Sequence, residues 1–309
     1  MHVIGMLRGT NCPWWIYSLA VFLRISDENI LADKCLFLRR QIVKLVYNAN
    51  SGHIGGSLSA TEIAAALYYS AIAHDPANPK WGGRDYVVWS KGHATPLAYS
   101  ILADCGYFPS QELSTFRKEG SRLQGHVDRL KVPGIEASSG PLGQGMSMAL
   151  GMALALRLDG KPNRVWAILS DGEHEEGATW EAIMAAGHYK ADNLTAILDY
   201  NNVQLTGPVP KIMDIAPIAE KYRAFNWNVL EADGHNISAL LESYKKAVEF
   251  QGKPTVVIAR TVKGKGVSIF EKEATGFHGT PPKKGEYEAA MAELGPAKWP
   301  DYVHSEHGK

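Results

Sequence analysis

Apolar residues along this chain form short continuous runs that alternate with segments of helical periodicity. The runs at residues 165–169 and 194–198 are almost entirely apolar, which is typical of strands buried on both faces of a sheet. Further strands are predicted at residues 86–90, 227–231 and 255–260, and helices at residues 36–48, 61–70, 142–158, from 176 onward, and 238–250. This alternation favours an α/β fold, a doubly wound and mostly parallel sheet flanked by helices.

The two ends of the chain depart from this alternation. Residues 12–23 are apolar but too few to span a bilayer, so we expect residues 1–25 to be an N-terminal extension outside the fold. Residues 26–309 are expected to form a single domain, with a glycine-rich and charged tail from about residue 262 that lacks strong periodicity.

Composition excludes some classes of partner. Hydrophobic residues make up 45% of the 309 residues, which is enough for a large buried core. The formal net charge is zero, so the chain has no basic excess with which to bind nucleic acid or an anionic membrane. Its three cysteines, Cys12, Cys35 and Cys105, are few and far apart, which is typical of a reducing cytosol, and we expect a cytoplasmic protein.

A carboxylate and an amide follow two of the predicted strands. Asp171 follows the first in the sequence Ser170-Asp171-Gly172, and Asn201 follows the second. Parallel strands place their carboxyl ends at one edge of the sheet, where ligands bind, so the two side chains are expected to meet. An Asp-Gly pair alone would be an ordinary helix cap. With Asn201 beside it, the pair indicates a Mg²⁺ site that a diphosphate completes.

Four histidines adjoin glycines in predicted loops, namely His53, His93, His126 and His278. None has the i, i+4 spacing of a helical zinc site. A glycine neighbour lets a ligand approach the backbone, and a neutral imidazole can orient hydroxyl groups or transfer protons near neutral pH. One such histidine alone is ordinarily structural, but four in the same context indicate a shared ligand site.

A glycine-rich loop precedes the helix predicted at residues 142–158. It reads Gly140-Pro141-Leu142-Gly143-Gln144-Gly145 and matches neither the Walker spacing nor Gly-x-Gly-x-x-Gly, so it is a weak phosphate-binding signal. Three glycines and a proline predict a tight turn that presents main-chain groups outward.

These motifs resemble the thiamine diphosphate domain of the transketolase family, together with Ser51-Gly52-His53 and Ser90-Lys91-Gly92-His93-Ala94. They occur in the family's order and cover roughly residues 30–285. The resemblance implies that thiamine diphosphate binds with a divalent metal, Mg²⁺ or else Ca²⁺ or Mn²⁺. The metal ligands would be Asp171, Asn201 and the backbone carbonyl of Val203.

The resemblance also implies roles for the remaining residues. Cofactor contacts would come from His93, Gly140, Pro141, Leu142, Asp171, Gly172, Asn201, Leu205 and His278. Catalytic proton transfer and sugar orientation would come from His53, His93, His126 and His278. Glu176 and Glu181 match acidic positions at the family's subunit interface, in a network that would share protons between two cofactor sites. Without the resemblance, they would be an ordinary charged first helical turn.

In the family, the glutamate that activates the pyrimidine ring lies in a second domain, and no part of these 309 residues resembles that domain. We therefore expect the N-terminal subunit of a split transketolase, completed by a C-terminal pyrimidine-domain subunit in an α₂β₂ heterotetramer. Such an enzyme would transfer a two-carbon ketol group from a ketose phosphate to an aldose phosphate. The pathway would be the pentose phosphate pathway or a route for modified sugars.

Three other functions stay open on the sequence. The α subunit of a thiamine-dependent 2-oxoacid dehydrogenase shares the metal motif and the split organisation, but the Gly-His loops favour a sugar substrate. A 1-deoxyxylulose-phosphate synthase-like enzyme normally holds its domains in one chain. A non-catalytic binding or regulatory subunit with this fold would be expected to have lost the histidines, which are present here.

Overall fold

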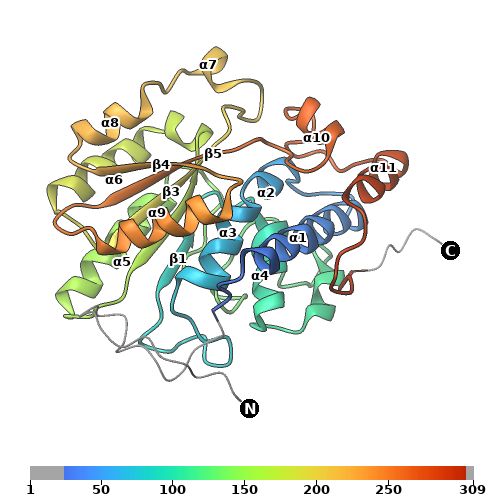
Figure 1. The fold of residues 1–309 in the computed structure, drawn as a ribbon, viewed down its shortest axis with the longest axis horizontal. Coiled ribbons are helices and arrows are strands. Elements are labelled where there is room, and N and C mark those ends of the chain that lie inside the picture. Colours follow the sequence, from blue (N-terminus) through green and yellow to red (C-terminus); the bar gives the residue numbers. More distant parts are fainter. Residues whose placement is uncertain (1–23, 304–309) are drawn as a thin grey trace.

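A parallel β-sheet forms the centre of the molecule (Figure 1). The computed structural model describes residues 24–303, and in this range the sheet has five strands in the order β1-β2-β3-β5-β4, with every neighbouring pair parallel. The strands are β1 (Tyr86–Trp89), β2 (Val165–Ser170), β3 (Leu194–Tyr200), β4 (Asn228–Asp233) and β5 (Thr255–Arg260). The predicted α/β class is confirmed.

Helices cover both faces of the sheet and enclose two hydrophobic cores. One layer contains α1 (Glu28–Asn48), α2 (Gly55–Ser59), α3 (Thr61–Ala66), the π-helical turn η2 (Leu67–Ala71), α4 (Thr95–Cys105), the 3₁₀ turn η3 (Ser110–Thr115) and α9 (Ile237–Glu249). The other contains α5 (Gly145–Leu158), α6 (Gly177–His188), α7 (Val209–Ile212) and α8 (Ile218–Ala224). Successive side chains of a strand point to opposite faces, so Trp166 and Ile168 join the first core while Ala167 and Leu169 join the second.

Local backbone chemistry explains where the helices begin. Helix α1 begins eight residues earlier than the pattern predicted, at Glu28, because the Asp27 side chain caps it by accepting the N–H of Asn29 at 2.8 Å. Helix α5 begins at Gly145 rather than at Leu142, because Gly143 has a left-handed φ of +84° that interrupts the helix. The glycine-rich loop therefore stays outside the helix.

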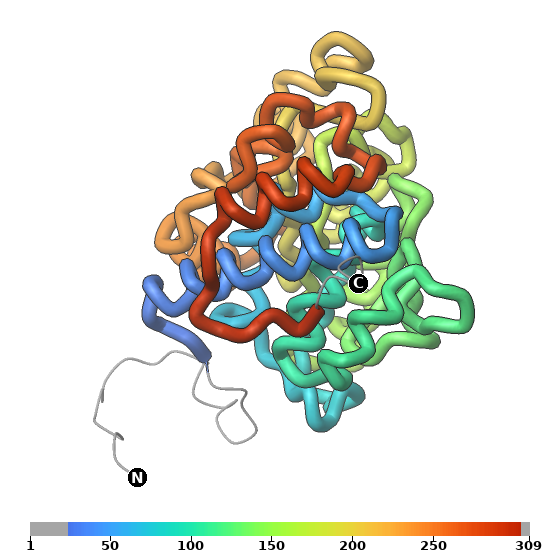
Figure 2. The backbone as a smooth tube through the Cα atoms, turned by 90° about the vertical axis from the view of Figure 1, so that its right-hand side faces the viewer, coloured from blue at the N-terminus to red at the C-terminus, as the bar shows by residue number. Residues whose placement is uncertain are grey.

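The tail from about residue 262 is more regular than expected. It contains α10 (Ser268–Lys272) and α11 (Lys284–Leu294), and α11 lies along α1 (Figure 2). Apolar residues recur at helical spacing in α11, at Tyr287, Ala290, Met291 and Leu294, and pack against the first core. Neither helix was predicted, because α11 has only a small apolar face in a charged segment and its periodicity is weak.

No helix within residues 24–303 is long and apolar enough to cross a membrane. Cys35 and Cys105 are buried and carry free thiols. The apolar stretch at residues 12–23, which includes Cys12, lies outside the described residues.

A buried charge cluster fixes the loop after β5 to the helical layer. Arg39 and Glu62 form an ion pair whose oxygen and nitrogen atoms are 2.6 Å apart, and His235 Nδ1 lies 3.0 Å from Glu62. His235 Nε2 accepts the N–H of Val262 at 2.8 Å, and Arg39 Nε donates to the carbonyl of Lys265 at 3.0 Å. Burial alone would raise the pKa of Glu62, but Arg39 and His235 lower it to about 2.

Removing the Glu62 carboxylate should destabilise the fold strongly. The substitution Glu62→Ala leaves the Arg39 guanidinium buried without its counter-charge, and we expect a loss of about 3–5 kcal/mol in the free energy of unfolding, measured by urea denaturation. Glu220→Ala is the matched control, because the Glu220–Arg223 pair is exposed and should contribute less than about 1 kcal/mol. Equal losses in the two variants would contradict this account.

Candidate active site

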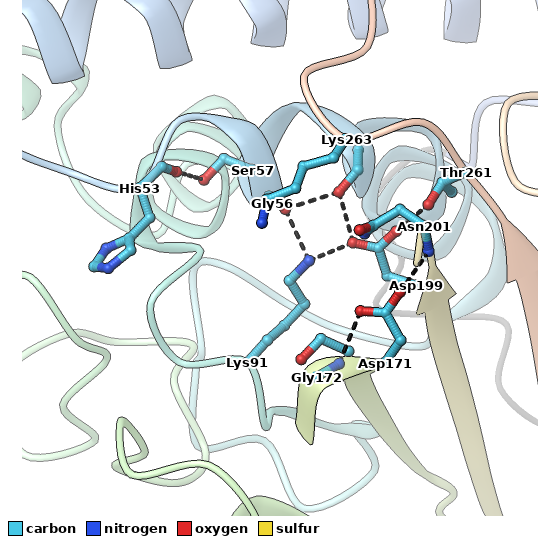
Figure 3. Close-up of polar contacts among 12 residues, drawn as sticks. His53, Gly56, Ser57, Lys91, Asp171, Gly172, Asp199, Asn201, Thr261 and Lys263 are labelled. Atoms are coloured by element: carbon cyan, nitrogen blue, oxygen red, sulfur yellow. Dashed lines mark hydrogen bonds and ion pairs between the residues drawn. The ribbon is translucent and has the colours of Figure 1, made fainter. Parts of the chain in front are cut away.

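The ends of β2 and β3 bring Asp171 and Asn201 together (Figure 3). Strand β2 ends at Ser170, which is in register with Asp199 of β3, so the residues that follow the two strands are neighbours. Asp171 Oδ2 accepts the N–H of Asn201 at 2.9 Å and also the N–H of Asn202. Asp171 Oδ1 accepts the N–H of Gly172 at 2.8 Å. The carboxylate is therefore held in one orientation by backbone donors.

The segment after β2 and the segment after β3 form a corner at this edge of the sheet. It contains carboxylate, amide and carbonyl oxygens, which are hard ligands for a metal ion, but no cluster of acidic side chains. Asn201 Oδ1 accepts the N–H of Val203 at 3.1 Å, which fixes the orientation of the amide beside the Val203 segment. Burial, and then the nearby Asp199 carboxylate, raise the pKa of Asp171 to about 6. Among the described residues there is no group of three His, Cys, Asp or Glu side chains that could hold a metal ion, so a metal here would need amide and carbonyl oxygens as well.

An ion pair between Lys91 and Asp199 lies beneath this corner. Both side chains are at most 1% exposed, and Lys91 Nζ also donates to the carbonyl of Gly56 at 2.8 Å (Figure 3). Asp199 additionally accepts the hydroxyl of Ser59 at 2.6 Å and that of Thr261. Burial would raise the pKa of Asp199, but these donors, Lys91 first, lower it.

A second buried lysine reaches the site from the loop after β5. Lys263 Nζ donates to the carbonyl of Val203 at 2.9 Å and to that of Gln204 at 3.2 Å, and lies 2.7 Å from His278 Nδ1. Its residue is 3% exposed, and burial lowers the pKa of the ammonium to about 8. Two cationic side chains therefore lie close to the carbonyl and carboxylate oxygens of the candidate metal site.

The four histidines form one group. The ring centroid of His53 lies 5.0 Å from that of His93, 6.1 Å from that of His126 and 5.4 Å from that of His278, and the His93 and His278 centroids are 5.5 Å apart. They come from four loops far apart in sequence, and the fold brings them together. Their roles stay predictions.

The group is electrically neutral near pH 7. Burial, followed by Arg117, His126 and Lys263, lowers the pKa of His53 to about 4, and burial followed by Lys263 lowers that of His278 to about 3. Burial and Lys91 lower the pKa of His93, and burial and Arg117 lower that of His126. Neutral rings can accept hydrogen bonds from sugar hydroxyls or donate to them.

The glycine loop borders the histidine group, and its residues differ in exposure. Gly140 is partly buried, with its Cα hydrogen facing the ring of His126, where a Cβ would approach within 3.0 Å. Leu142 is partly buried, while Pro141 is exposed. Leu205, expected to pack on the cofactor ring, is 58% exposed.

Glu176 and Glu181 are both exposed at the start of α6, at one side of the site. They take no part in the buried network of Lys91 and Asp199, but the Glu176 side chain packs against Gly143 of the glycine loop. Their predicted role at a subunit interface requires this exposure, and it stays a prediction.

Sequence reasoning missed three buried residues of the site, Lys91, Lys263 and Glu173. Lys91 lies inside the Ser90–Ala94 motif, and Lys263 lies in the loop after β5, three residues beyond Arg260. Ligands bind beyond the carboxyl ends of parallel strands, so the loop after every predicted strand is a candidate site. Examining the loop after β5 in this way would have found Lys263. Glu173 is fully buried in the 3₁₀ turn η4 (Gly172–Glu175), and burial raises the pKa of its carboxyl to about 7.

Known proteins resemble this chain over most of its length. The family described as "Transketolase, thiamine diphosphate binding domain" matches residues 32–306. The 6-deoxy-6-sulfo-D-fructose transketolase subunit of Clostridium sp. (strain MSTE9) is 41% identical over 271 residues, which are 87% of this chain and 98% of that protein. One subunit of the apulose-4-phosphate transketolase of Phocaeicola vulgatus is 38% identical over 256 residues, which are 83% of this chain and 90% of that protein.

Solved structures agree with these matches. The transketolase from Campylobacter jejuni superposes with a TM-score of 0.82 at 32% identity, over 90% of this chain but only 44% of the solved chain. The transketolase from Leishmania mexicana superposes with a TM-score of 0.81 at 28% identity, over 89% of this chain and 43% of the solved chain. The chain therefore belongs to the transketolase family and contains its thiamine diphosphate binding domain.

Proposed function

We propose that this chain is the N-terminal subunit of a two-component cytoplasmic transketolase that transfers a two-carbon ketol group from a ketose to an aldose. The observation that carries the proposal is the meeting of an oxygen-rich corner, two buried lysines and four neutral histidines at one edge of the parallel sheet. The family relationship supports the same reaction class, because the relatives of similar length are named as transketolase subunits.

The residues present fit a divalent metal with a diphosphate. Asp171 keeps free lone pairs on a carboxylate already oriented by backbone donors, and the Asn201 amide and Val203 carbonyl add two hard oxygens nearby. Three protein oxygens are enough for Mg²⁺ when phosphate oxygens complete its shell, and Ca²⁺ or Mn²⁺ would also accept them. Lys91 and Lys263 supply positive charge for the diphosphate itself.

Each part of the site has a separate task in this proposal. When bound, thiamine diphosphate supplies the electron sink that lets a carbon–carbon bond of the ketose break. The loop at Gly140, Pro141 and Leu142 holds the pyrimidine end, and Gly172, His93 and His278 contact the diphosphate. The neutral rings of His53, His93, His126 and His278 orient the sugar hydroxyls and move protons between them.

A partner subunit would complete the site on the exposed side. Helices α5 and α6 contact each other and expose Leu158 (89%) and Met184 (53%), and Gly151, Ala155 and the acidic Glu181 are exposed on the same two helices. An exposed apolar surface of this kind is suited to a protein interface. We propose that it pairs two copies of this chain, and that a C-terminal subunit with the activating glutamate completes an α₂β₂ assembly.

The substrates are proposed to be anionic sugars. The two relatives above are named for a sulfonated fructose and for a phosphorylated apulose, and both are small ketoses with an acidic group. The basic side chains around the histidine group, Lys91, Lys263 and Arg117, would attract rather than repel such substrates. The identity of the sugar would be set mainly by the C-terminal subunit.

The isolated chain is expected to bind thiamine diphosphate weakly and to lack turnover. Co-expression with its C-terminal subunit should restore ketol transfer, measured as release of an aldose from a ketose phosphate in the presence of an acceptor aldehyde. Robust transfer by the purified chain alone would contradict the two-component proposal. Decarboxylation of pyruvate by the assembled pair, without ketol transfer, would instead indicate a 2-oxoacid dehydrogenase subunit.

Asp171→Asn should weaken metal-dependent cofactor binding. The substitution removes the negative charge of the proposed metal site, so we expect the affinity for thiamine diphosphate with Mg²⁺ to fall by at least about tenfold. Calorimetric titration measures the affinity, and a thermal melt checks that the variant is folded. Asp159→Asn is the control, since Asp159 is exposed and pairs with Lys161. An unchanged affinity in Asp171→Asn would contradict the assigned metal site.

The neutral state of His53 should make folding pH-dependent. Its pKa is lower in the folded chain than the ordinary 6.5, so below about pH 6.5 the unfolded chain binds more protons, and stability falls as the pH falls toward about 4. His53→Asn should therefore lose less stability than the wild type between about pH 7 and about pH 5. Urea denaturation at each pH measures the free energy of unfolding of both proteins. If this free energy changed equally with pH in the two, His53 would not be held in its neutral form by burial.

A further inference from the structure

Glu173 joins two loops that the proposed function assigns to opposite ends of the cofactor. Its Oε1 accepts the hydroxyl of Ser90, and it accepts the N–H of Gly143 at 3.0 Å. Ser90 begins the turn that carries Lys91 and His93, and Gly143 lies in the glycine loop proposed to hold the pyrimidine. One carboxylate therefore ties the diphosphate side of the site to the pyrimidine side.

The contact surface between these two loops leaves no room for adjustment. A Cβ at Gly145 would overlap Ser90, and a Cβ at Gly92 would overlap Ser139. Ser139 Oγ also donates to the carbonyl of Trp89 at the end of β1. The two loops are packed backbone against backbone. The hydrogen bonds that cross between them therefore hold them at this one separation.

A purely structural role does not explain the residue type. Glu173 is 0% exposed, no ion pair within residues 24–303 joins it to a cation, and its Oε2 has no hydrogen-bond partner in that part of the chain. Burying a carboxyl group in this way is unfavourable, and an uncharged side chain could fill the space. Unfavourable buried groups that persist in a fold are concentrated at functional sites.

We propose that Glu173 is a positioning residue for thiamine diphosphate, which sets the glycine loop at Gly140–Gly145 against the Ser90 turn so that both ends of the cofactor are held at once. The proposal rests on the proposed function, because it needs the glycine loop to hold the pyrimidine. Glu173 touches neither the metal corner at Asn201 nor the histidine rings through any hydrogen bond of the described chain.

Two probes separate this role from a structural one. Thiamine diphosphate uses both ends of the site, whereas inorganic pyrophosphate uses only the metal and lysine end. Each is titrated calorimetrically with Mg²⁺ into the chain assembled with its C-terminal subunit. In Glu173→Ala we expect thiamine diphosphate to bind at least about tenfold more weakly, because the glycine loop loses its link to the Ser90 turn and no longer holds the pyrimidine end in place. The affinity for pyrophosphate should change by less than about twofold, because pyrophosphate does not use the glycine loop.

Further variants keep the test valid if Glu173→Ala folds poorly. Glu173→Gln keeps an acceptor oxygen for the N–H of Gly143, so its affinity for thiamine diphosphate should stay within about threefold of the wild type. Ser90→Ala removes the other donor and should show the same selective loss, and the Ser90 and Glu173 losses should not add in the double variant. Ser100→Ala is the control, since it removes a buried hydrogen bond within α4 that does not join the two loops.

Equal weakening of both probes in Glu173→Ala, or no weakening of either, would overturn the proposal. It would also fall if the wild-type chain bound pyrophosphate as tightly as thiamine diphosphate, because the glycine loop would then contribute nothing for Glu173 to position. Ketol transfer by the chain together with its C-terminal subunit decides the proposed function separately. The assembled enzyme could catalyse ketol transfer while Glu173→Ala shows no selective loss of affinity for thiamine diphosphate. That result would support the proposed function and overturn only the role of Glu173.

Discussion

The buried ion pair between Lys91 and Asp199 is the interaction on which the site depends. Lys91 comes from the turn after β1 and Asp199 from β3, so the pair crosses over β2 at the carboxyl edge of the sheet. Hydrogen bonds from Ser59 and Thr261, and to the carbonyl of Gly56, attach α2 and the end of β5 to the same two charges. An ion pair this deeply buried costs solvation energy, and these extra hydrogen bonds offset part of that cost.

The same charges explain why the histidines are neutral. A site rich in lysine and arginine attracts a diphosphate, but it also disfavours protonated imidazole. Lys91, Lys263 and Arg117 all act in this direction on the histidine group, in addition to burial. In the proposed function, a single electrostatic arrangement would therefore serve two needs, positive charge for the anionic end of the cofactor and uncharged rings for the sugar.

The parts of the fold and of the site that depend on neighbouring residues could be predicted from the sequence. The parts that depend on contacts between residues far apart in the sequence could not. Continuous apolar runs are a local signal, so β2, β3 and β5 were found almost to the residue, and the strand-end rule then placed Asp171 beside Asn201. Glu173 was missed because its meaning lies in contacts with Ser90 and Gly143, which no spacing in the sequence reveals. Helix α11 was missed because its small apolar face, centred on Ala290, acquires significance only against α1.

The parallel pairing of β1 with β2 has a consequence for how the chain folds. The two strands are neighbours in the sheet although residues 90–164 separate them, and this segment contains Lys91, His93, His126 and the glycine loop. Closing so long a loop has a large entropic cost before any contact repays it, and pairings of this kind are slow to form. Strands β2 and β3 are closer in sequence and can associate first. The cofactor site is therefore expected to be among the last parts of the molecule to become ordered during folding.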